Sequence, residues 1–486
     1  GGAVVPLAIG GGWTDGVLNA VVPNVLATGE YQLRVTHTNG NFTDPSVTVT
    51  VVADVLNPID SNGNAFAVHT IQAGALPGDT PIQDAIDVAL PGDLIMLAPG
   101  VYEELIWMHK PVKLQGWGPF SVTINARKSP AEKLQVWRDK LKIDLAKSTS
   151  TNADDEFCTI DDQNTQGFNA GNNEPELFSF MQGAGITVVG DCGQNGQTSW
   201  VAGQARIDGL AITGSDSGGA IFASQHANNL VISNNRLVGN VGNYGGGITV
   251  GNGKKLFNNA FVDNVNENLV INHNMIIENG AIDGAGGAIS LYTGADNYRI
   301  TNNRICGNFT QGNGGGIGHL GLSDGGLIQN NKILFNQSFK QASEVNGGGI
   351  FIAGERVAAP FQLGVEPLLT VGAGSVTIRE NLIQGNQAGA GDGGGISLLN
   401  INGAEVAANP TNAAPVVNGD PIEWFKVDIF NNIIVNNLAG LAGAGISIQD
   451  ALDVRIIHDT IANNDSTATT ISAFTAAAPQ GPTIRQ

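Results

Sequence analysis

The chain has 486 residues, of which only 14% are charged, and its formal net charge is −20 at pH 7. A protein that binds nucleic acid needs a basic surface to displace phosphate counterions, so this balance argues against a nucleic-acid partner. No apolar run approaches the ~20 residues of a membrane-spanning helix. The 67 glycines indicate turns and strands more than helices, which favours an all-β fold.

Residues 1–55 end in a segment that alternates apolar and polar residues on both sides of Asn39-Gly40, TGEYQLRVTHTNGNFTDPSVTVTVV. Such alternation about an Asn-Gly pair predicts a β-hairpin. The segment resembles the closing hairpin of an immunoglobulin-like IPT/TIG domain, which implies that residues 1–55 are the C-terminal part of such a module. Residues 56–76 are predicted to be a linker.

A short amphipathic helix is predicted at Pro81 to Leu90, near the start of a region that spans residues 77–486. Thr80 stands at the N-cap position, and Gln83 is placed to reach back to it. Three short apolar strands follow in PGDLIMLAPGVYEELIWMHKPVKLQGWG. This order closely resembles the N-terminal cap and first coils of pectin-lyase-like right-handed parallel β-helix repeat proteins, which implies that fold for residues 77–486.

The largest predicted insertion, residues 127–204, opens with an amphipathic helix, SPAEKLQVWRDKLKIDLA, that has Ser129 as its cap. Seven of the chain's 23 basic residues lie between Arg127 and Lys147. The helix therefore either meets a membrane surface or an anionic polymer, or packs its apolar stripe on the rest of the fold, and we expect the packing.

The same insertion contains two features whose roles stay open. Cys158 and Cys192 either form a disulfide in an oxidising compartment or remain free thiols. Carboxylates gather nearby without the spacing of a known calcium loop, so Ca²⁺ is a weak candidate ligand and no other cofactor is expected. These carboxylates are Asp154, Asp155, Glu156, Asp161 and Asp162.

An Asn-containing repeat runs through the rest of the chain at spacings of 39, 29, 28, 50, 51 and 27 residues. Its anchors are Asn235, Asn274, Asn303, Asn331, Asn381, Asn432 and Asp459. An Ile stands three residues before every anchor and an aliphatic residue two after it, and a third strand begins with Ile after each Gly-rich turn. Side chains that recur once per coil stack between parallel strands about 4.8 Å apart. We therefore predict a β-helix with three strands per coil and an internal Asn ladder whose anchors take the left-handed conformation.

Two further stretches bear on the context of the chain. The fragment GGAIF at Gly218 and the later GGGI fragments resemble repeats of polymorphic surface proteins and autotransporter passengers, which implies an extracellular or cell-surface location. The final TTISAFTAAAPQGPTIRQ lacks polar capping residues, so we expect the array or another domain to continue beyond Gln486.

Loops lengthen three coils at one edge, at residues 251–266, 353–374 and 400–425. Loops on one edge of a rigid scaffold either form a binding site or only shield that edge. Trp424 and Phe425 offer aromatic faces on which a sugar ligand can stack. Four carboxylates are weak candidates for a loop-built active site: Asp263, Glu267, Asp420 and Glu423.

The resemblance to pectin-lyase-like proteins implies that, in an enzyme of this fold, the reacting groups lie on outward positions of the third strand. The corresponding residues here cannot act as acids or bases: Thr249, Ser290, Gly318, Phe351, Ser397 and Ser447. His273, His319 and His458 stand alone, so no metal site is expected. A mostly apolar column after the anchors is expected to turn inward at a bend: Val238, Ile277, Cys306, Leu334, Gln384 and Val435.

These observations favour a non-catalytic structural or binding segment of a large secreted or cell-surface protein. Its expected partners are a polysaccharide or other domains of the same protein. The alternative is a polysaccharide lyase or glycoside hydrolase with a loop-built active site, because a fold does not dictate a function.

Overall fold

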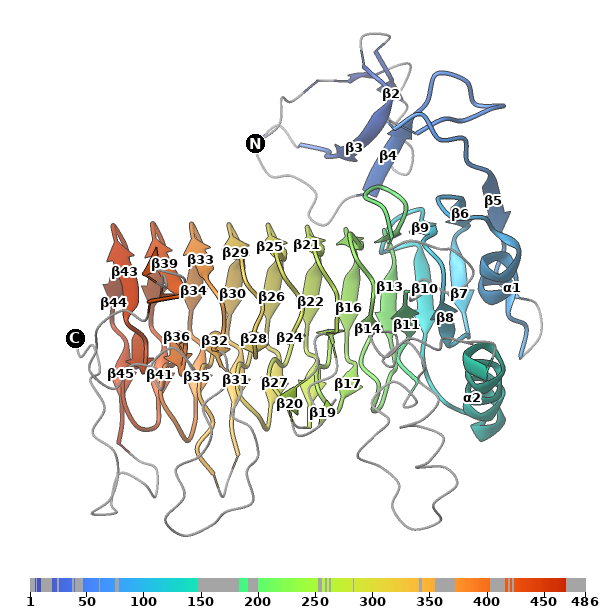
Figure 1. The fold of residues 1–486 in the computed structure, drawn as a ribbon. Coiled ribbons are helices and arrows are strands. Elements are labelled where there is room, and N and C mark those ends of the chain that lie inside the picture. The colour runs from blue at the N-terminus through green and yellow to red at the C-terminus, as the bar shows by residue number, and fades with distance from the viewer. Residues whose placement is uncertain are drawn as a thin grey trace.

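The computed structural model is a right-handed parallel β-helix with an N-terminal hairpin against its side (Figure 1). Successive coils stack from the N-terminal end, at α1 (Pro81–Val88), to the C-terminal end near residue 468 (Figure 1). The structure describes residues 5, 7–9, 20–23, 26–36, 39, 47–60, 62–74, 78–146, 183–190, 200–251, 256–257, 260–261, 264–282, 284–340, 343–354, 372–402, 416–417, 420–421 and 424–468.

Two long parallel sheets form the walls on either side of the Asn anchors. Sheet 1 precedes each anchor and contains β5 (Val68–Ile71), β6 (Leu94–Leu97), β9 (Lys113–Gly116), β12 (Arg206–Asp208), β15 (Val231–Ser233), β21 (Val270–Asn272), β25 (Arg299–Thr301), β29 (Gly326–Gln329), β33 (Val376–Arg379), β39 (Lys426–Phe430) and β43 (Asp453–Ile457). Sheet 2 follows each anchor and contains β7 (Gly100–Tyr102), β10 (Val122–Asn125), β13 (Ala211–Thr213), β16 (Arg236–Val238), β22 (Met275–Ile277), β26 (Arg304–Cys306), β30 (Lys332–Leu334), β34 (Leu382–Gln384), β40 (Ile433–Val435) and β44 (Thr460–Ala462).

Two more sheets complete each coil, so the prediction of three strands per coil is wrong for the later coils. Sheet 3 is a row of two-residue strands: β17 (Val241–Gly242), β23 (Gly280–Ala281), β27 (Phe309–Thr310), β31 (Gln337–Ser338), β35 (Gln387–Ala388), β41 (Leu438–Ala439) and β45 (Asp465–Ser466). Sheet 4 contains β8 (Ile106–Met108), β11 (Ile186–Val189), β14 (Ile221–Gln225), β18 (Ile248–Val250), β24 (Ile289–Tyr292), β28 (Ile317–Leu320), β32 (Ile350–Ala353), β36 (Ile396–Leu399) and β42 (Ile446–Gln449). Two-residue strands carry too little alternation to be recognised in a sequence.

The interior is a continuous aliphatic column, because equivalent residues of successive coils pair in register. Ile300 of β25 pairs with Ile271 of β21 and Ile328 of β29, and all three side chains are fully buried. The predicted stacking of branched aliphatic residues is therefore confirmed. Burial of each such side chain stabilises the fold by about 1.5–3 kcal/mol.

The predicted Asn ladder lies inside this core. Nδ2 of Asn303 donates to Oδ1 of Asn331 at 3.0 Å and to the carbonyl oxygen of Ile271 at 2.9 Å. The same bonds link Asn235, Asn274, Asn331, Asn381 and Asn432, and the last of these donates to Asp459 at 2.9 Å. The ladder satisfies the polar groups that the apolar interior would otherwise leave unpaired.

The left-handed bend was predicted at the anchor, but in the structure it lies one residue earlier. Asn302 has φ 58° and Asn330 has φ 55°, whereas Asn303 and Asn331 do not have positive φ. The residue before the anchor lies at the corner and adopts the left-handed conformation, which Asn tolerates. The anchor side chain is thereby directed inward.

A second Asn ladder follows five residues after the first. Nδ2 of Asn308 donates to Oδ1 of Asn336 at 2.9 Å and to the carbonyl oxygen of Ile276 at 2.9 Å. The column continues through Asn240, Asn279, Asn386, Asn437 and Asn464. It closes the corner between sheets 2 and 3 in the way that the first ladder closes the corner between sheets 1 and 2.

Two columns that were predicted from the sequence differ in the structure, the first in its exposure and the second in its direction. The third-strand residues Thr249 and Ser290 are buried rather than exposed, because the Gly-rich turn before each strand folds over them and accepts their hydroxyl bonds at Gly245 and Gly286. The column from Val238 to Val435 does not turn inward, since it stays half-buried on the outer face of sheet 2 and the bend comes one residue later.

Glycines in the turn before sheet 4 allow successive coils to touch backbone to backbone. A Cβ added at Gly316 would lie 2.6 Å from the carbonyl oxygen of Gly349 in the next coil. Only glycine fits such an approach.

Helix α1 closes the first coil, as predicted, but its cap differs from the prediction. The Thr80 side chain makes no capping hydrogen bond to the helix backbone. The carboxylate of Glu104, a buried residue between β7 and β8, instead accepts the N–H groups of Ile82 and Gln83, both at 3.1 Å. Gln83 bonds the backbone of Trp107 in β8, so it is not free to reach back.

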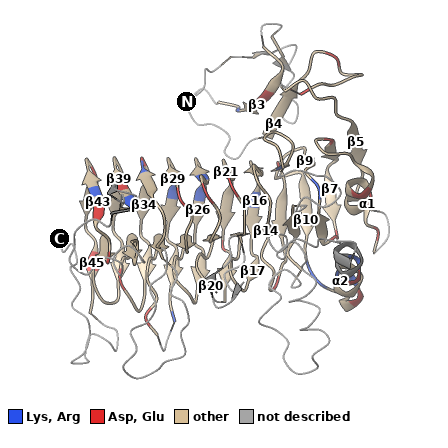
Figure 2. Cartoon of the chain, in the orientation of Figure 1, with Lys and Arg blue, Asp and Glu red and all other residues tan. Residues whose placement is uncertain are grey.

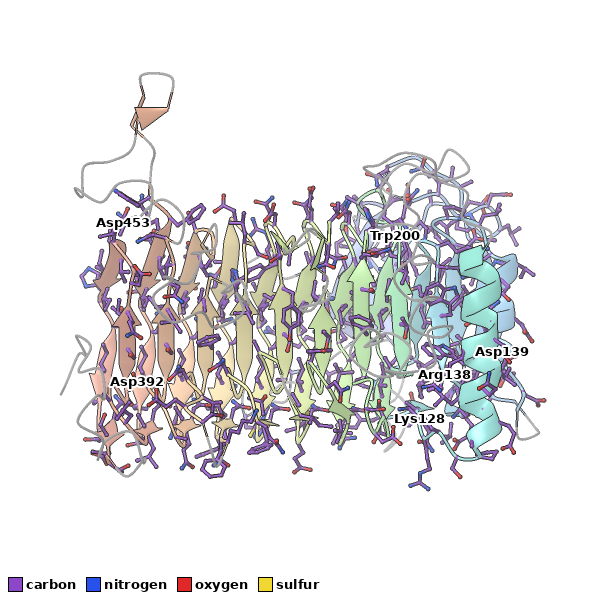
Figure 3. All side chains as sticks on the ribbon, turned by 60° about the horizontal axis from the view of Figure 1, so that its bottom comes forward. Lys128, Arg138, Asp139, Trp200, Asp392 and Asp453 are labelled. Atoms are coloured by element: carbon purple, nitrogen blue, oxygen red, sulfur yellow. The ribbon has the colours of Figure 1, made fainter. Side chains whose placement is uncertain are left out.

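Helix α2 (Ala131–Ala146) lies along the N-terminal coils (Figure 3). Trp137 is buried and Leu134 is partly buried against a second apolar cluster that includes Leu105, Trp107 and Phe222. The expected packing on the solenoid is therefore confirmed for the part of the helix whose side chains are described. Its lysines form ion pairs with acidic residues of the N-terminal coils, as Lys140 does with Asp87 at 2.7 Å.

The predicted N-terminal hairpin is formed by β3 (Gly29–Leu33) and β4 (Val47–Val51), with Tyr31 opposite Val49. Its likeness to an IPT/TIG module stays a prediction. A second antiparallel pair is formed by β1 (Ala8–Ile9) and β2 (Ala20–Val21). The hairpin lies on the outward face of sheet 1, where Nε2 of Gln115 donates to the carbonyl oxygen of Thr48 at 2.7 Å.

Candidate ligand-binding groove

A groove of about 510 Å³ lies on the outward face of sheet 1, over β25, β29, β33 and β39. These strands alternate buried aliphatic residues with outward side chains that form the groove floor. Its principal polar and aromatic residues are Arg299, Thr377, Arg379, Lys426, Asp428 and Phe430. The N-terminal hairpin covers the earlier part of the same face, so the groove occupies the part that remains open.

Two outward columns build the floor. Arg299, Leu327, Thr377 and Asp428 pair in register in one column, and the column ends at Arg455. Thr301, Gln329, Arg379 and Phe430 pair in the other. The columns run along the axis of the solenoid, so the groove is extended across several coils.

Among the described residues that line the groove, three are cationic and one, Asp428, is anionic. Arg455 holds Asp428 with two hydrogen bonds of 2.6 and 2.8 Å, a bidentate pair that leaves this carboxylate engaged. Arg299, Arg379 and Lys426 add three positive charges to a chain whose net charge is −20. Blue and red segments both occur in the neighbouring coils around β26, β29 and β43 (Figure 2).

Arg379 is held in place by its neighbours. Its guanidinium lies 5.7 Å from the ring centre of Phe430 and donates to Oε1 of Gln329 at 3.0 Å. Gln329 in turn donates to Glu380 at 2.7 Å. A guanidinium fixed on an aromatic face keeps donors directed toward solvent, where a carboxylate or sulfate can accept them.

The candidate catalytic carboxylates are not brought together within the described residues. Glu267 is exposed in the turn before β21, outside the groove lining. Asp420 belongs to β38 (Asp420–Pro421), which pairs with β37 (Val416–Val417), while Asp263 and Glu423 lie outside the described residues. Their catalytic role stays a prediction.

The two aromatic residues proposed for sugar stacking lie just before β39. Phe425 is partly buried and packs against the main core, beside Gly372. Trp424 is half-buried. Their role in ligand binding stays a prediction, and for Phe425 it competes with core packing.

The remaining predicted ligand groups mostly fall outside the described residues. These are Cys158, Cys192 and the acidic run from Asp154 to Asp162. Among the residues that the structure does describe, no group of three or more His, Cys, Asp or Glu side chains could hold a metal ion. Neither described helix has the length and apolar character needed to cross a membrane.

His319 and Asp392 are among the titratable groups outside the groove whose pKa values are strongly shifted for structural reasons. Burial lowers the pKa of His319 to about 4, and this side chain bonds Tyr298 and two backbone carbonyls inside the core. Burial and the nearby Glu344 raise the pKa of Asp392 to about 6. Asp392 (Figure 3) sits in the Gly-rich turn, where Oδ1 accepts the N–H of Ala442 at 2.8 Å.

The groove residues were not singled out from the sequence, although a signal was present. Arg299, Asp428 and Arg455 each stand four residues before an anchor, and Arg379 and Phe430 stand two before one. Both offsets alternate with the buried Ile, so they predict outward side chains. These residues form one groove floor only because strands that are distant in the sequence pair side by side, as those of Gln329 and Arg379 do.

Comparisons with known proteins leave the family open. No protein-family model matches the sequence, and no curated protein matches it. Among solved structures, the catalytic domain of a GH87 α-1,3-glucanase in complex with tetrasaccharides is similar at a TM-score of 0.27 and 11% identity, covering 87% of this chain and 69% of that chain. A PL6 family polysaccharide lyase from Pseudopedobacter saltans is similar at a TM-score of 0.20 and 13% identity, covering 86% of this chain and 96% of that chain.

Proposed function

We propose that this chain is a non-catalytic binding segment that holds an anionic polysaccharide along the outward face of sheet 1. The observation that carries the proposal is the concentration of cations in an extended groove on an otherwise acidic chain. An extracellular or cell-surface location belongs to the same proposal, because such polymers are found there.

The shape of the groove supports a polymer more than a small molecule. Its floor is a flat strand face that repeats every ~4.8 Å along the solenoid axis. A small-molecule site is usually a concave, mostly apolar pocket that buries most of its ligand. An extended chain with regularly spaced negative groups can instead meet Arg299, Arg379 and Lys426 in successive contacts.

The composition of the groove supports binding rather than catalysis. Hydrolysis of a glycosidic bond needs two carboxyl groups at a fixed separation, and β-elimination needs a base beside the groups that neutralise the uronate. Among the described residues that line the groove, Asp428 is the one carboxylate. It is already engaged by Arg455 in two hydrogen bonds.

Affinity electrophoresis through polygalacturonate, alginate and a neutral glucan tests the proposal. Arg379→Ala should weaken retardation by the acidic polymers about tenfold to a hundredfold, because a hydrogen bond to a charged group contributes ~1.5–3 kcal/mol. Arg304→Ala is the matched control, since Arg304 is an exposed arginine on sheet 2 outside the groove. Retardation of the wild type should also fall as salt is raised, because exposed charges are screened.

Three results would contradict the proposal. Equal effects of Arg379→Ala and Arg304→Ala would place the ligand elsewhere. Retardation by the neutral glucan alone would remove the role of charge. Formation of unsaturated products or new reducing ends would show that the chain is an enzyme.

A further inference from the structure

Three exposed phenylalanine side chains gather at sheet 3, away from the groove on sheet 1. Phe309 lies in β27, and Phe335 and Phe339 flank β31 in the next coil. Phe309 pairs in register with Gln337, which stands between the other two in the chain. The exposed fractions are 36% for Phe309, 61% for Phe335 and 39% for Phe339. Clustered apolar exposure of this kind indicates an interaction surface.

Phe335 has a conformation that a bulky side chain rarely adopts. Its φ is 53°, in the left-handed region. The equivalent corner residue in the other coils is Gly239, Glu278, Gly307, Gly385, Asn436 or Asn463. Positive φ recurs at this corner in each of these coils, so the corner itself requires it, and in this coil it falls on a large aromatic residue. A bulky aromatic residue at a corner that most coils fill with Gly or Asn motivates a functional hypothesis.

Two of the rings pack against glycines of the next coil. A Cβ added at Gly385 would lie 2.5 Å from Cδ1 and Cε1 of Phe335, and one added at Gly389 would lie 2.6 Å from Cδ2 of Phe339. Each ring therefore rests on a glycine backbone, which fixes its position against the solenoid. The exposed part of the ring is then presented to solvent.

Amide side chains, rather than charged ones, accompany the rings on sheet 3. The outward residues of β27, β31 and β35 are Phe309, Gln337 and Gln387, which pair in register. Phenyl faces contact the C–H faces of pyranose rings, and amides donate to and accept from their hydroxyl groups. The pairing of uncharged rings with amides fits a neutral sugar and contrasts with the cations of the groove.

We propose that Phe309, Phe335 and Phe339 form a second binding surface that holds a neutral polysaccharide by stacking its sugar rings. This surface is independent of the anionic-polymer groove, because it uses a different sheet and a different chemistry. The two surfaces together would let one chain contact two kinds of polysaccharide.

Retention on insoluble cellulose, on a β-1,3-glucan and on amylose gels tests this surface. The wild type should be retained by at least one of the three, and Phe335→Ala combined with Phe339→Ala should weaken its retention at least tenfold. Phe120→Ala is the control, because Phe120 is an even more exposed phenylalanine (75%) in the turn before β10. Arg379→Ala should leave this retention unchanged, which separates failure of this surface from failure of the groove.

Phe335→Asn provides a second readout that a merely structural role would not give. Asn tolerates the left-handed conformation, so the midpoint of thermal unfolding should rise while retention falls. A fall in both would mean that Phe335 is structural. The proposal is also overturned if none of the three polysaccharides retains the wild type, if Phe120→Ala is equally harmful, or if the rings instead support concentration-dependent dimers.

Discussion

The carboxylate of Asp208 accepts two hydrogen bonds from Thr48, one from its backbone N–H at 3.0 Å and one from its hydroxyl at 2.7 Å. The two residues are 160 positions apart in the chain. Asp208 also accepts from Ser233 and Asn234, so four donors converge on one fully buried carboxylate. This contact joins the N-terminal hairpin to sheet 1.

Replacing Asp208 should therefore loosen the hairpin. Asp208→Ala leaves several buried donors without an acceptor, at a cost on the order of 3 kcal/mol. Amide hydrogen exchange at residues 47–51 should accelerate, while exchange in β25 and β29 should stay unchanged. Asp428→Ala is the control, since it removes a carboxylate from the outward face of the same sheet. Undiminished protection of β4 in Asp208→Ala would show that other contacts hold the hairpin.

The Asn ladder should be the most sensitive element of the core. Asn303→Ala removes bonds to Asn274, Asn331 and the carbonyl of Ile271, so the free energy of unfolding should fall by about 2–4 kcal/mol. Asn302→Gly, at the adjacent left-handed corner, should change it by less than about 1 kcal/mol. Denaturant unfolding of both variants measures the difference. Similar losses would mean that the ladder bonds contribute little.

The buried His319 should make stability fall in mild acid. Burial depresses the pKa of His319 from 6.5 to about 4, so its contribution is present above pH 6.5 and is lost as pH falls toward 4. The loss amounts to about 3 kcal/mol over this window. His319→Gln should flatten the difference in unfolding free energy between pH 7 and pH 4.5. An unchanged slope in the variant would assign the acid sensitivity to other groups.

Glu104 should have the opposite pH dependence. Burial raises its pKa from 4.5 to about 7, so its contribution is complete below pH 4.5 and is lost as pH rises through 7. Glu104→Gln loses one of the two bonds that cap α1 but carries no charge. The stability of the wild type relative to the variant should therefore fall by about 3 kcal/mol between pH 4.5 and pH 8. A gap that does not change with pH would indicate that Glu104 keeps one protonation state throughout.

Local repeats made the solenoid predictable, because the residues that stack are those that recur. Ile300 and Asn303 could be assigned to the core since equivalent residues stand at the same offsets in every coil. The second ladder at Asn308 was equally visible, because Asn stands five residues after every anchor. This Asn stands beside the glycine-rich turn, where a turn alone is enough to explain an Asn, so its recurrence does not by itself predict a ladder.

Contacts between distant segments could not be predicted in this way. The cap that Glu104 gives to α1 spans 22 residues, and nothing in the local pattern marks it. The groove floor joins Gln329 to Arg379 across a long insertion. Burial of Ser290 depends on how the preceding turn folds back over its own strand. In each case the spacing of residues in the sequence predicts the direction of a side chain but not the residues that it contacts.

The identical bonds of successive ladder steps have an evolutionary consequence. Asn303 and Asn331 are 28 residues apart and make the same bonds to the coils on either side. Excision of residues 303–330 would bring Asn331 next to Asn274 with the geometry that Asn303 now has. Such a gene can lengthen or shorten its product by duplicating or losing a single coil, and the breadth of any polymer footprint would change with it in steps of one strand.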